Sequence, residues 1–284
     1  MSDSSVSPPV IVERAPAKLN LALHVRARRA DGYHDLETLF VFAHHGDTVS
    51  LAIGVPSLTI TGPFAAGLSA GPDNLVLRAE QAFRTRFGIV AEHAITLDKH
   101  LPVASGIGGG SADAAATLRA LAQAHGIAVA DPRLHAIAAS LGADVPACLL
   151  GRAALGHGKG DALTPIVGLG DMPALLVNPG VAVSTAAVFA RWDGVDRGAL
   201  GAGDALACAL AGRNDLQQPA EQVAPVIAEL LTLLGRQPGV RLARMSGSGA
   251  TCFALFDHPD ARDAAACAIA AAHPSWWHLR TAIR

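Results

Sequence analysis

The sequence predicts an α+β fold, in which strands and helices follow one another without a regular alternation. Two patterns carry this prediction. Apolar residues occupy alternate positions from Leu19 to Val25, which is typical of a half-buried strand. Between Asn74 and Gly88 they recur instead at the spacing of one helical face. Because the two patterns mix irregularly further along, a doubly wound parallel sheet is not expected.

The same periodicities, together with capping residues, predict the remaining elements in order. Strands are expected at residues 48–53, 58–61, 93–97, 174–177, 240–245, 251–256 and 277–283. Helices are expected at residues 111–125, 132–141, 184–192, 221–234 and 259–272. Ser111 is the predicted N-cap of the first of these helices, and Asp131 before Pro132 caps the second.

The local amino-acid composition changes in two places. Residues 1–9 are rich in Ser and Pro and are expected to fray. After residue 155 glycine becomes frequent, which predicts a division into two domains, residues 10–158 and residues 159–284.

Composition narrows the class of protein. The chain of 284 residues is 51% hydrophobic and 16% charged, which is enough apolar material for a sizeable core. Its net charge of −2 argues against a nucleic-acid partner. The uncharged stretches 50–72 and 172–190 are broken by Pro and Gly, so neither predicts a membrane span.

Cysteine and histidine usage points to a cytoplasmic protein without a metal centre. The four cysteines are scattered and contain no Cys-x-x-Cys pair, so we expect reduced, buried thiols. The start of the chain lacks the basic and apolar regions of a secretion signal. The 12 histidines show no metal-binding spacing, and no protein ligand is assigned to a metal.

A glycine-rich stretch leads into one of the predicted helices. Gly106, Gly108, Gly109 and Gly110 precede Ser111 and an alanine-rich run. Backbone N–H groups at a helix start have no partner within the helix and attract anions, and glycine lets an oxyanion approach them. An ordinary turn before a helix is the alternative. The stretch lacks the Gly-Lys-Ser/Thr of a Walker loop and fails the Gly-x-Gly-x-x-Gly dinucleotide pattern.

Three other segments are candidates for chemistry. Lys18 and Asn20 project to one side of the strand whose other side is lined by leucine, which is either a solvated face or a cation beside an amide. Asp144 follows a predicted helix and precedes apolar residues; it is either a turn residue or a partly buried carboxylate that needs a partner. The segment Met245–Thr251, Met-Ser-Gly-Ser-Gly-Ala-Thr, predicts a tight turn between two strands.

The pattern Pro102-x-x-x-Gly106-Ile-Gly-Gly-Gly-Ser111 resembles the ATP-phosphate loop of the GHMP kinases. The segments around Lys18 and Met245 resemble the first and third motifs of that family, and all three occur in the family's order. The resemblance implies two domains: an N-terminal nucleotide-binding domain similar to domain 2 of ribosomal protein S5, and a C-terminal ferredoxin-like α/β sandwich. It also implies that the glycines of the third motif close against the phosphate loop.

The resemblance further implies a kinase that uses ATP and Mg²⁺, with Lys18 and Asp144 as catalytic residues. It assigns the nucleotide to eleven consecutive loop residues and, on the adenine side, to Asn74. The loop residues are Pro102, Val103, Ala104, Ser105, Gly106, Ile107, Gly108, Gly109, Gly110, Ser111 and Ala112.

The stretch Asp31-Gly-Tyr-His-Asp-Leu36 resembles one branch of this family. That branch phosphorylates the 2-hydroxyl of 4-diphosphocytidyl-2-C-methyl-D-erythritol in non-mevalonate isoprenoid biosynthesis. The resemblance implies that Tyr33 stacks on the cytosine, that His34 hydrogen-bonds its edge and that Phe189 closes the other side. Thr185 and Asn20 would lie near the methylerythritol end.

Two positions depart from the resemblance, and other functions stay open. Ala112 replaces a second Ser, and Gly156–Gly160 (Gly-His-Gly-Lys-Gly) stands where relatives often have Gly-x-Gly-Glu. The alternatives are a homoserine or mevalonate type of GHMP kinase, a non-catalytic nucleotide sensor on the same fold, and a structural protein without a ligand. We expect a monomer or homodimer with small-molecule substrates.

Overall fold

The computed structural model describes residues 9–284. These residues form two compact units. The first unit contains the chain up to Ala15, Gly46–Val103 and Gly110–Leu149; the second contains Pro16–His45, Ala104–Gly109 and Leu150–Arg284. Strands β1 (Ile11–Arg28) and β2 (His34–Ile53) run through both units. The predicted single cut at residue 158 stays a prediction, and most of the expected frayed end, residues 1–8, lies outside the described residues.

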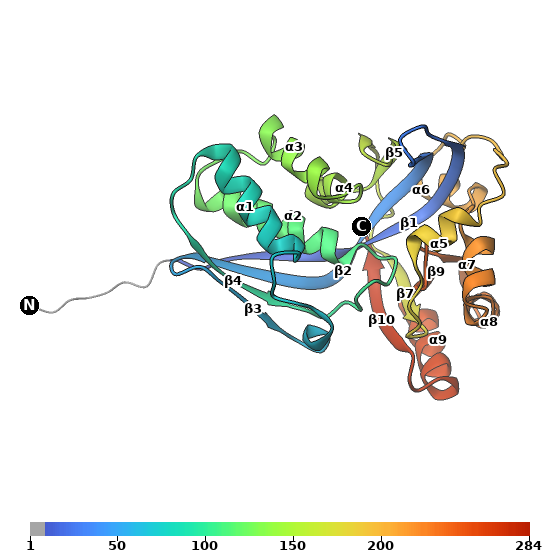
Figure 1. Cartoon of the computed structure of the whole chain (residues 1–284). Helices are drawn as coiled ribbons and strands as arrows, with labels where there is room; N and C mark the ends of the chain where they lie inside the picture. Colours follow the sequence, from blue (N-terminus) through green and yellow to red (C-terminus); the bar gives the residue numbers. More distant parts are fainter. Residues whose placement is uncertain (1–8) are drawn as a thin grey trace, which may run out of the picture. The chain divides into compact units, whose positions relative to one another are not determined.

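The first unit is a small sheet covered by helices. The second half of β2 pairs antiparallel with β4 (His93–Asp98), which pairs parallel with β3 (Ser57–Thr61). A 3₁₀ turn, η1 (Ala65–Gly67), follows β3. Figure 1 shows the helices on one face of these strands. The helices are α1 (Leu75–Phe87), α2 (Gly109–Ala124), α3 (Pro132–Leu141) and α4 (Val145–Leu150).

Helix ends in this unit follow local capping rules. The Asn74 side chain accepts from the Val76 N–H, and Gly88 ends α1 in the left-handed region. Asp131 accepts from the Arg133 N–H at the start of α3. The expected helix between Asn74 and Gly88 and the expected cap at Asp131 are confirmed. The prediction that Ser111 caps α2 is wrong, because α2 begins two residues earlier, at Gly109.

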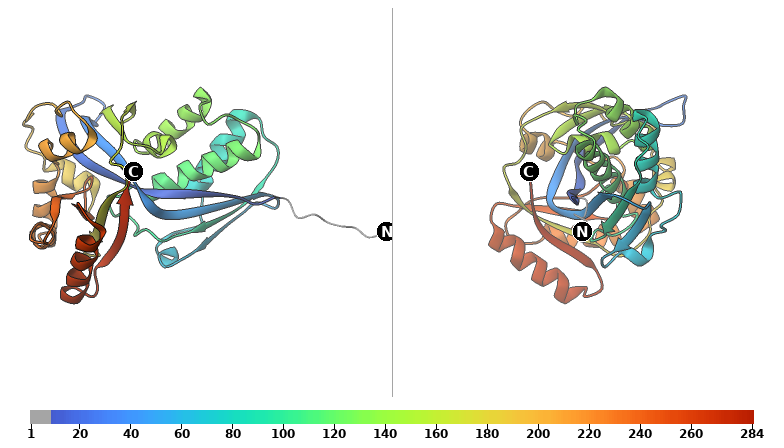
Figure 2. Two further views of the ribbon diagram at one scale, coloured as in Figure 1. Left: turned by 180° about the vertical axis from the view of Figure 1, so that it is seen from behind. Right: turned by 90° about the vertical axis from the view of Figure 1, so that its left-hand side faces the viewer.

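The second unit is an antiparallel sheet with helices packed on it. Its strand order is β10 (Trp277–Ile283), β7 (Met172–Asn178), β9 (Cys252–Phe256) and β8 (Val240–Met245). At its other edge Ile283 of β10 pairs with Ala43 of β2. Figure 2 shows α9 (Pro259–Ala272) lying along β10.

A hairpin and shorter helices complete the second unit. Strands β5 (Ala154–Gly158) and β6 (Ala162–Pro165) form the hairpin, and β5 pairs with the start of β2. The other helices are α5 (Thr185–Ala190), α6 (Ala205–Ala211), α7 (Gln217–Val223) and α8 (Val226–Gly235). The mixture of parallel and antiparallel strands with irregularly placed helices confirms the predicted α+β class.

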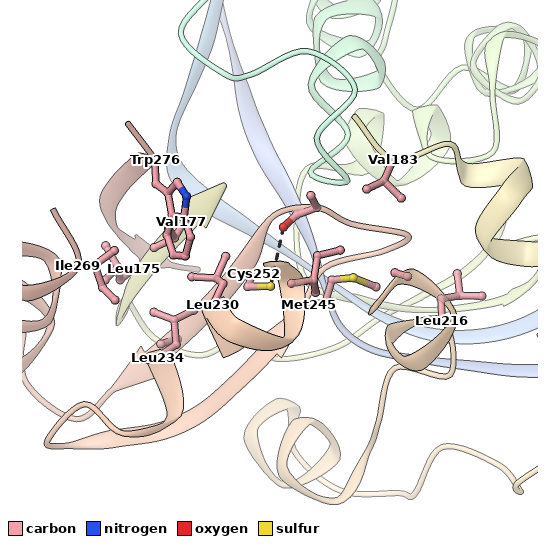
Figure 3. Close-up of a cluster of buried hydrophobic side chains, with 14 of the residues drawn as sticks. Leu175, Val177, Val183, Leu216, Leu230, Leu234, Met245, Cys252, Ile269 and Trp276 are labelled. Carbon is pink, nitrogen blue, oxygen red and sulfur yellow. Dashed lines mark hydrogen bonds between the residues drawn. The ribbon is translucent and has the colours of Figure 1, made fainter. Parts of the chain in front are cut away.

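One apolar cluster holds α5, α7, α8 and α9 to the sheet of the second unit (Figure 3). Leu175 of β7 and Met245 of β8 lie in it with Leu230 of α8 and Ile269 of α9. All four side chains are at most 2% exposed. Burial of a side chain of this size contributes about 1.5–3 kcal/mol, so this cluster fixes the sheet that carries the third glycine motif.

Other predictions about the second unit need correction. The expected helix 221–234 is two helices, because Pro225 lacks an N–H and forces Ala224 into extended backbone. The hairpin β5–β6 and helices α4 and α6 were not predicted, since each is too short to show a clear period. All four cysteines are free, but Cys267 is exposed rather than buried. Within residues 9–284 no helix combines the length and apolar character needed to cross a membrane.

Candidate active site

A buried polar chain runs along the middle of β1. The Lys18 Nζ donates to Asn20 Oδ1 at 2.9 Å, and Asn20 Nδ2 donates to Thr38 Oγ1 of β2 at 2.8 Å. Lys18 and Asn20 are each only 3% exposed, so the alternative of a solvated strand face is wrong. The Thr38 hydroxyl ends the chain by donating to the Ala22 carbonyl at 2.7 Å. The amide therefore has a fixed orientation, with its oxygen toward the ammonium.

The glycine loop is attached directly to this strand. The Lys18 N–H donates to the Ile107 carbonyl at 2.9 Å. Gly106 and Gly108 have φ values of 80° and 65°, in the left-handed region that favours glycine. From Gly109 the chain continues as α2, whose first N–H groups have no partner within the helix. The loop thus presents backbone donors beside the lysine-bearing strand.

The turn between β8 and β9 closes against the same loop, as the resemblance implies. The Ser246 hydroxyl donates to the Gly106 carbonyl at 3.1 Å and accepts from the Asn20 N–H at 3.2 Å. The Thr251 N–H donates to the Ser105 carbonyl at 3.0 Å. A Cβ at Gly106 would lie 2.6 Å from the Gly249 carbonyl oxygen, so glycine is required at Gly106 on steric grounds. Motifs far apart in the sequence therefore form one structure.

Asp144 lies between α3 and α4 in the first unit. Its carbonyl accepts from the Cys148 N–H at 3.0 Å, which places Asp144 at the start of α4. The residue is half-buried, which confirms the expectation from its apolar surroundings. A carboxylate at a helix start is stabilised by the N–H groups there. That Asp144 meets Lys18 over a substrate stays a prediction.

The stretch predicted to bind a base carries one exposed ring and one enclosed ring. Tyr33 is 55% exposed. The His34 ring stacks on Phe189 with centroids 4.7 Å apart, and it meets Trp192 edge-on at 5.6 Å. The His34 Nε2 is buried and has no hydrogen-bond partner among the described residues. Burial, with the nearby Arg28 charge, lowers the pKa of His34, so the neutral imidazole is favoured.

Three further predicted contacts have definite structural surroundings. Phe189 stacks on His34 here, whereas the resemblance implied that it closes the pocket opposite Tyr33. The Thr185 and Ser248 hydroxyls share a hydrogen bond of 2.9 Å, which ties α5 to the β8–β9 turn. The Asn74 amide donates to the Ser69 carbonyl at 2.8 Å while its oxygen caps α1, so both ends of this side chain are used. Their ligand roles stay predictions.

A buried ionic cluster beside the loop was not predicted from the sequence. The Lys99 ammonium contacts the carboxylates of both Asp47 and Asp113, and it lies 2.7 Å from Asp113 Oδ2. Asp47 Oδ1 also accepts from the backbone N–H groups of His100 and Leu101 at 2.5 and 2.8 Å, just before Pro102. A lone Asp within the apolar run of α2 is the signal that could have pointed to this cluster, because a buried charge needs a partner.

The electrostatics of this cluster are unbalanced, since two carboxylates share one ammonium. Burial raises the pKa of Asp113 to about 8; Lys99 opposes the rise and Asp47 adds to it. Burial works against the charge on Lys99, but Asp113 and Asp47 outweigh it and raise the pKa of its ammonium. The Asp113 Oδ1 has no hydrogen-bond partner among residues 9–284. With a proton on Asp113, the remaining charges of the cluster are the Lys99 ammonium and the Asp47 carboxylate, so the cluster is neutral.

Family models match the chain in two regions. Residues 74–152 match the N-terminal domain of the GHMP kinases, and residues 196–275 match their C-terminal domain. The fold agrees: a homoserine kinase structure from Cytophaga hutchinsonii has a TM-score of 0.74 at 18% identity, covering 99% of this chain and 98% of that one. The two family matches and the shared fold thus place the chain in the GHMP kinase class.

More similar proteins narrow the class. A 4-diphosphocytidyl-2-C-methyl-D-erythritol kinase of Rhizorhabdus wittichii is 58% identical over 96% of this chain and 94% of its own length. One of Sphingopyxis alaskensis is 52% identical over 94% and 96%. A crystal structure of 4-(cytidine 5'-diphospho)-2C-methyl-D-erythritol kinase has a TM-score of 0.78 at 34% identity, covering 96% and 99%. The chain belongs to the 4-diphosphocytidyl-2-C-methyl-D-erythritol kinase family.

Proposed function

We propose that the protein transfers the γ-phosphoryl group of ATP to the 2-hydroxyl of 4-diphosphocytidyl-2-C-methyl-D-erythritol. One observation carries the proposal: Lys18 and Asn20, joined by a buried hydrogen bond, lie on the strand that is bonded to both glycine motifs. Phosphoryl transfer depends mainly on positioning and on charge neutralisation. A buried ammonium fixed beside a loop of backbone donors provides both.

The loop Pro102–Ala112 and the start of α2 would bind the phosphates through backbone N–H groups. Among residues 9–284 no group of three or more His, Cys, Asp or Glu side chains is arranged to hold a metal ion. Mg²⁺ would enter with ATP as MgATP, where it would neutralise phosphate charge, and no protein ligand is assigned to it. Asn74 would lie toward the adenine side.

The transfer step is a displacement at the γ-phosphorus. The 2-hydroxyl oxygen attacks, the bond from the γ-phosphorus to the bridging oxygen breaks, and ADP leaves. The hydroxyl proton passes to the Asp144 carboxylate and then to solvent, which requires contact at about 2.6–3.2 Å, directly or through one water. Lys18 would orient Asp144 and offset the charge that develops on the transferring group.

The cytidine end would be recognised in the second unit. Tyr33 offers an exposed ring for stacking on the cytosine, and the neutral His34 can hydrogen-bond its edge. Phe189 and Thr185 on α5 would line the remaining side, with Asn20 at the methylerythritol end. The four free cysteines support a reducing, cytoplasmic location.

The proposal is tested by measuring ADP release with a panel of alcohols: 4-diphosphocytidyl-2-C-methyl-D-erythritol, homoserine, mevalonate and galactose. Of these four alcohols, we expect only the cytidyl substrate to be phosphorylated. Turnover with homoserine or mevalonate in its place would identify another kind of GHMP kinase. ATP binding without turnover on any alcohol would identify a sensor and overturn the proposed activity.

A further inference from the structure

Lys159 lies at the tip of the β5–β6 hairpin, in the glycine-rich segment that departs from the family resemblance. Its Nζ lies 4.8 Å from the centroid of the Tyr33 ring, within the range of a cation–π contact. Tyr33 is the side chain on which we propose that the cytosine stacks. The lysine ammonium therefore lies over one face of the ring that is proposed to bind the base.

Strand pairing places the lysine there. Strand β5 pairs antiparallel with β2 from Phe40↔Ala154 to Leu36↔Gly158, so the residue after Gly158 continues toward the beginning of β2. That beginning carries His34, and Tyr33 precedes it. The position of Lys159 thus follows from a strand register.

The glycines of the segment keep the hairpin tight. A Cβ at Gly156 would lie 2.7 Å from the Phe40 ring and 3.1 Å from the Thr38 methyl group. Gly158 and Gly160, on either side of the lysine, have φ values of 67° and 93°. The lysine is therefore presented from a constrained turn.

Some cationic side chains near Tyr33 are already paired with carboxylates, and others could still bind an anionic ligand. Arg29 pairs with Asp31 and Asp35, and Arg26 pairs with Glu37 and Asp196. Within the described part of the chain, neither Lys159 nor Arg28 forms an ion pair with a carboxylate. Asp161, two residues after the lysine, accepts from the Lys159 backbone N–H at 3.2 Å. Lys159 is half-buried, so part of its desolvation has already occurred in the folded state.

We propose that Lys159 is a substrate-binding residue whose ammonium contacts the diphosphate of the cytidyl substrate. The inference rests on the proposed function, because it takes the diphosphate from that substrate. A base stacked on Tyr33 carries its phosphates within reach of a four-carbon side chain over the same ring. An ammonium contact to a phosphate oxygen is a charge-assisted hydrogen bond, which is stronger than a neutral one.

The test compares the binding of CDP and of cytidine by calorimetry, with the ATP site saturated by a non-hydrolysable ATP analogue. Lys159→Met removes the charge but keeps an apolar stem. We expect it to weaken CDP binding about tenfold and to leave cytidine binding unchanged. Lys159→Arg should restore most of the CDP affinity. Arg152→Met, which removes an exposed cation at the other end of the hairpin, is the matched control and should have no effect.

Two results would overturn the assignment. One is an unchanged CDP affinity in Lys159→Met. The other is an equal loss for CDP and cytidine, which would mean that the lysine acts only by holding the Tyr33 ring. In both cases wild-type protein still binds CDP, and the proposed substrate stands. Failure of wild-type protein to bind CDP would overturn the proposed substrate together with this inference.

Discussion

The Lys18 ammonium is held by a side chain two residues further along its own strand. The Nζ donates to Asn20 Oδ1 at 2.9 Å, and the Asn20 amide is itself fixed by donation to Thr38. Residues at i and i+2 project to the same face of a strand, so β1 builds this pair locally. The backbone N–H groups of the same two residues bond the glycine loop and the β8–β9 turn. Strand β1 therefore positions both the Lys18 ammonium and the glycine loop.

Replacing Asn20 tests whether this orientation matters for catalysis. Asn20→Ala removes the fixed acceptor from a buried ammonium, and we expect kcat to fall at least about tenfold, with KM for ATP changed much less. Thr38→Val is the control, because it leaves the bond between Lys18 and Asn20 in place and should have a smaller effect. Equal kcat values for wild type and Asn20→Ala would show that Lys18 needs no such support.

The close contact between Gly106 and the β8–β9 turn predicts a sharp difference between two glycine substitutions. Gly106→Ala would bring a Cβ within 2.6 Å of the Gly249 carbonyl oxygen and 2.7 Å of the Ser246 carbonyl oxygen. Since both are backbone atoms, the loop must move, and KM for ATP should rise at least about tenfold.

Gly126→Ala is the matched control for this substitution. Gly126 also has a positive φ, 64°, but nothing lies within 4 Å of the added Cβ. We expect it to lose about 1 kcal/mol of stability from backbone strain, with an unchanged KM for ATP. Nucleotide kinetics and thermal unfolding of both variants provide the comparison. Similar KM values for the two variants would argue against a fitted phosphate loop.

His34 is expected to determine affinity for the cytidyl substrate. His34→Ala removes a neutral imidazole that is held between Phe189 and Trp192, and KM for that substrate should rise about 10- to 100-fold while KM for ATP is unchanged. His44→Ala removes an exposed histidine that pairs with Asp171 and serves as the control. An unaltered KM for the cytidyl substrate in His34→Ala would remove His34 from base recognition.

The raised pKa of Asp113, about 8, predicts how stability changes with pH. Between about pH 4 and pH 8 the folded protein keeps a proton that an unfolded Asp releases. The contribution of this group to the free energy of unfolding therefore has its full value below about pH 4, and it is lost as the pH rises toward 8. Asp113→Asn has no such proton. Between pH 5 and pH 8 the unfolding free energy of this variant should therefore fall by at least about 1 kcal/mol less than that of the wild type.

Denaturant unfolding at several pH values measures this difference. Thr117→Val is the control, because it removes a buried hydroxyl one turn further along α2 and no titrating group. Its pH dependence should match that of the wild type. If Asp113→Asn and wild type lost the same free energy over this range, Asp113 would be ionised throughout it.

What the sequence predicted was mostly local. Asn74, Gly88 and Asp131 act at helix ends through their own neighbours. The alternation along Leu19–Val25 correctly predicted a strand, but the expectation that this strand is half-buried is wrong, because tertiary packing buries both of its faces. The glycine loop and Asp144 could be proposed as site residues because their patterns are short and contiguous. The helical spacing of the apolar residues on both sides of Pro225 predicted one continuous helix, although the proline itself indicates a break.

The contacts that were not predicted join residues far apart in the chain. Lys99 pairs with Asp47 and Asp113, which only the packing of β2, β4 and α2 brings together. Trp192, two residues after α5, meets His34 edge-on where Phe189 of α5 stacks on the same ring, and no spacing in the sequence encodes these pairs. The tip of the β5–β6 hairpin is placed beside Tyr33 by strand register, which also depends on tertiary structure.

In the proposed reaction Asp144 takes the proton of the accepting hydroxyl while Lys18 neutralises charge. The most direct test of this reaction is the turnover of Asp144→Asn with ATP and 4-diphosphocytidyl-2-C-methyl-D-erythritol, measured as ADP release at saturating concentrations of both. We expect kcat to fall about 10²- to 10⁴-fold, the usual range for loss of a general base, with both KM values little changed. Near-normal turnover of this variant would show that Asp144 is not the general base.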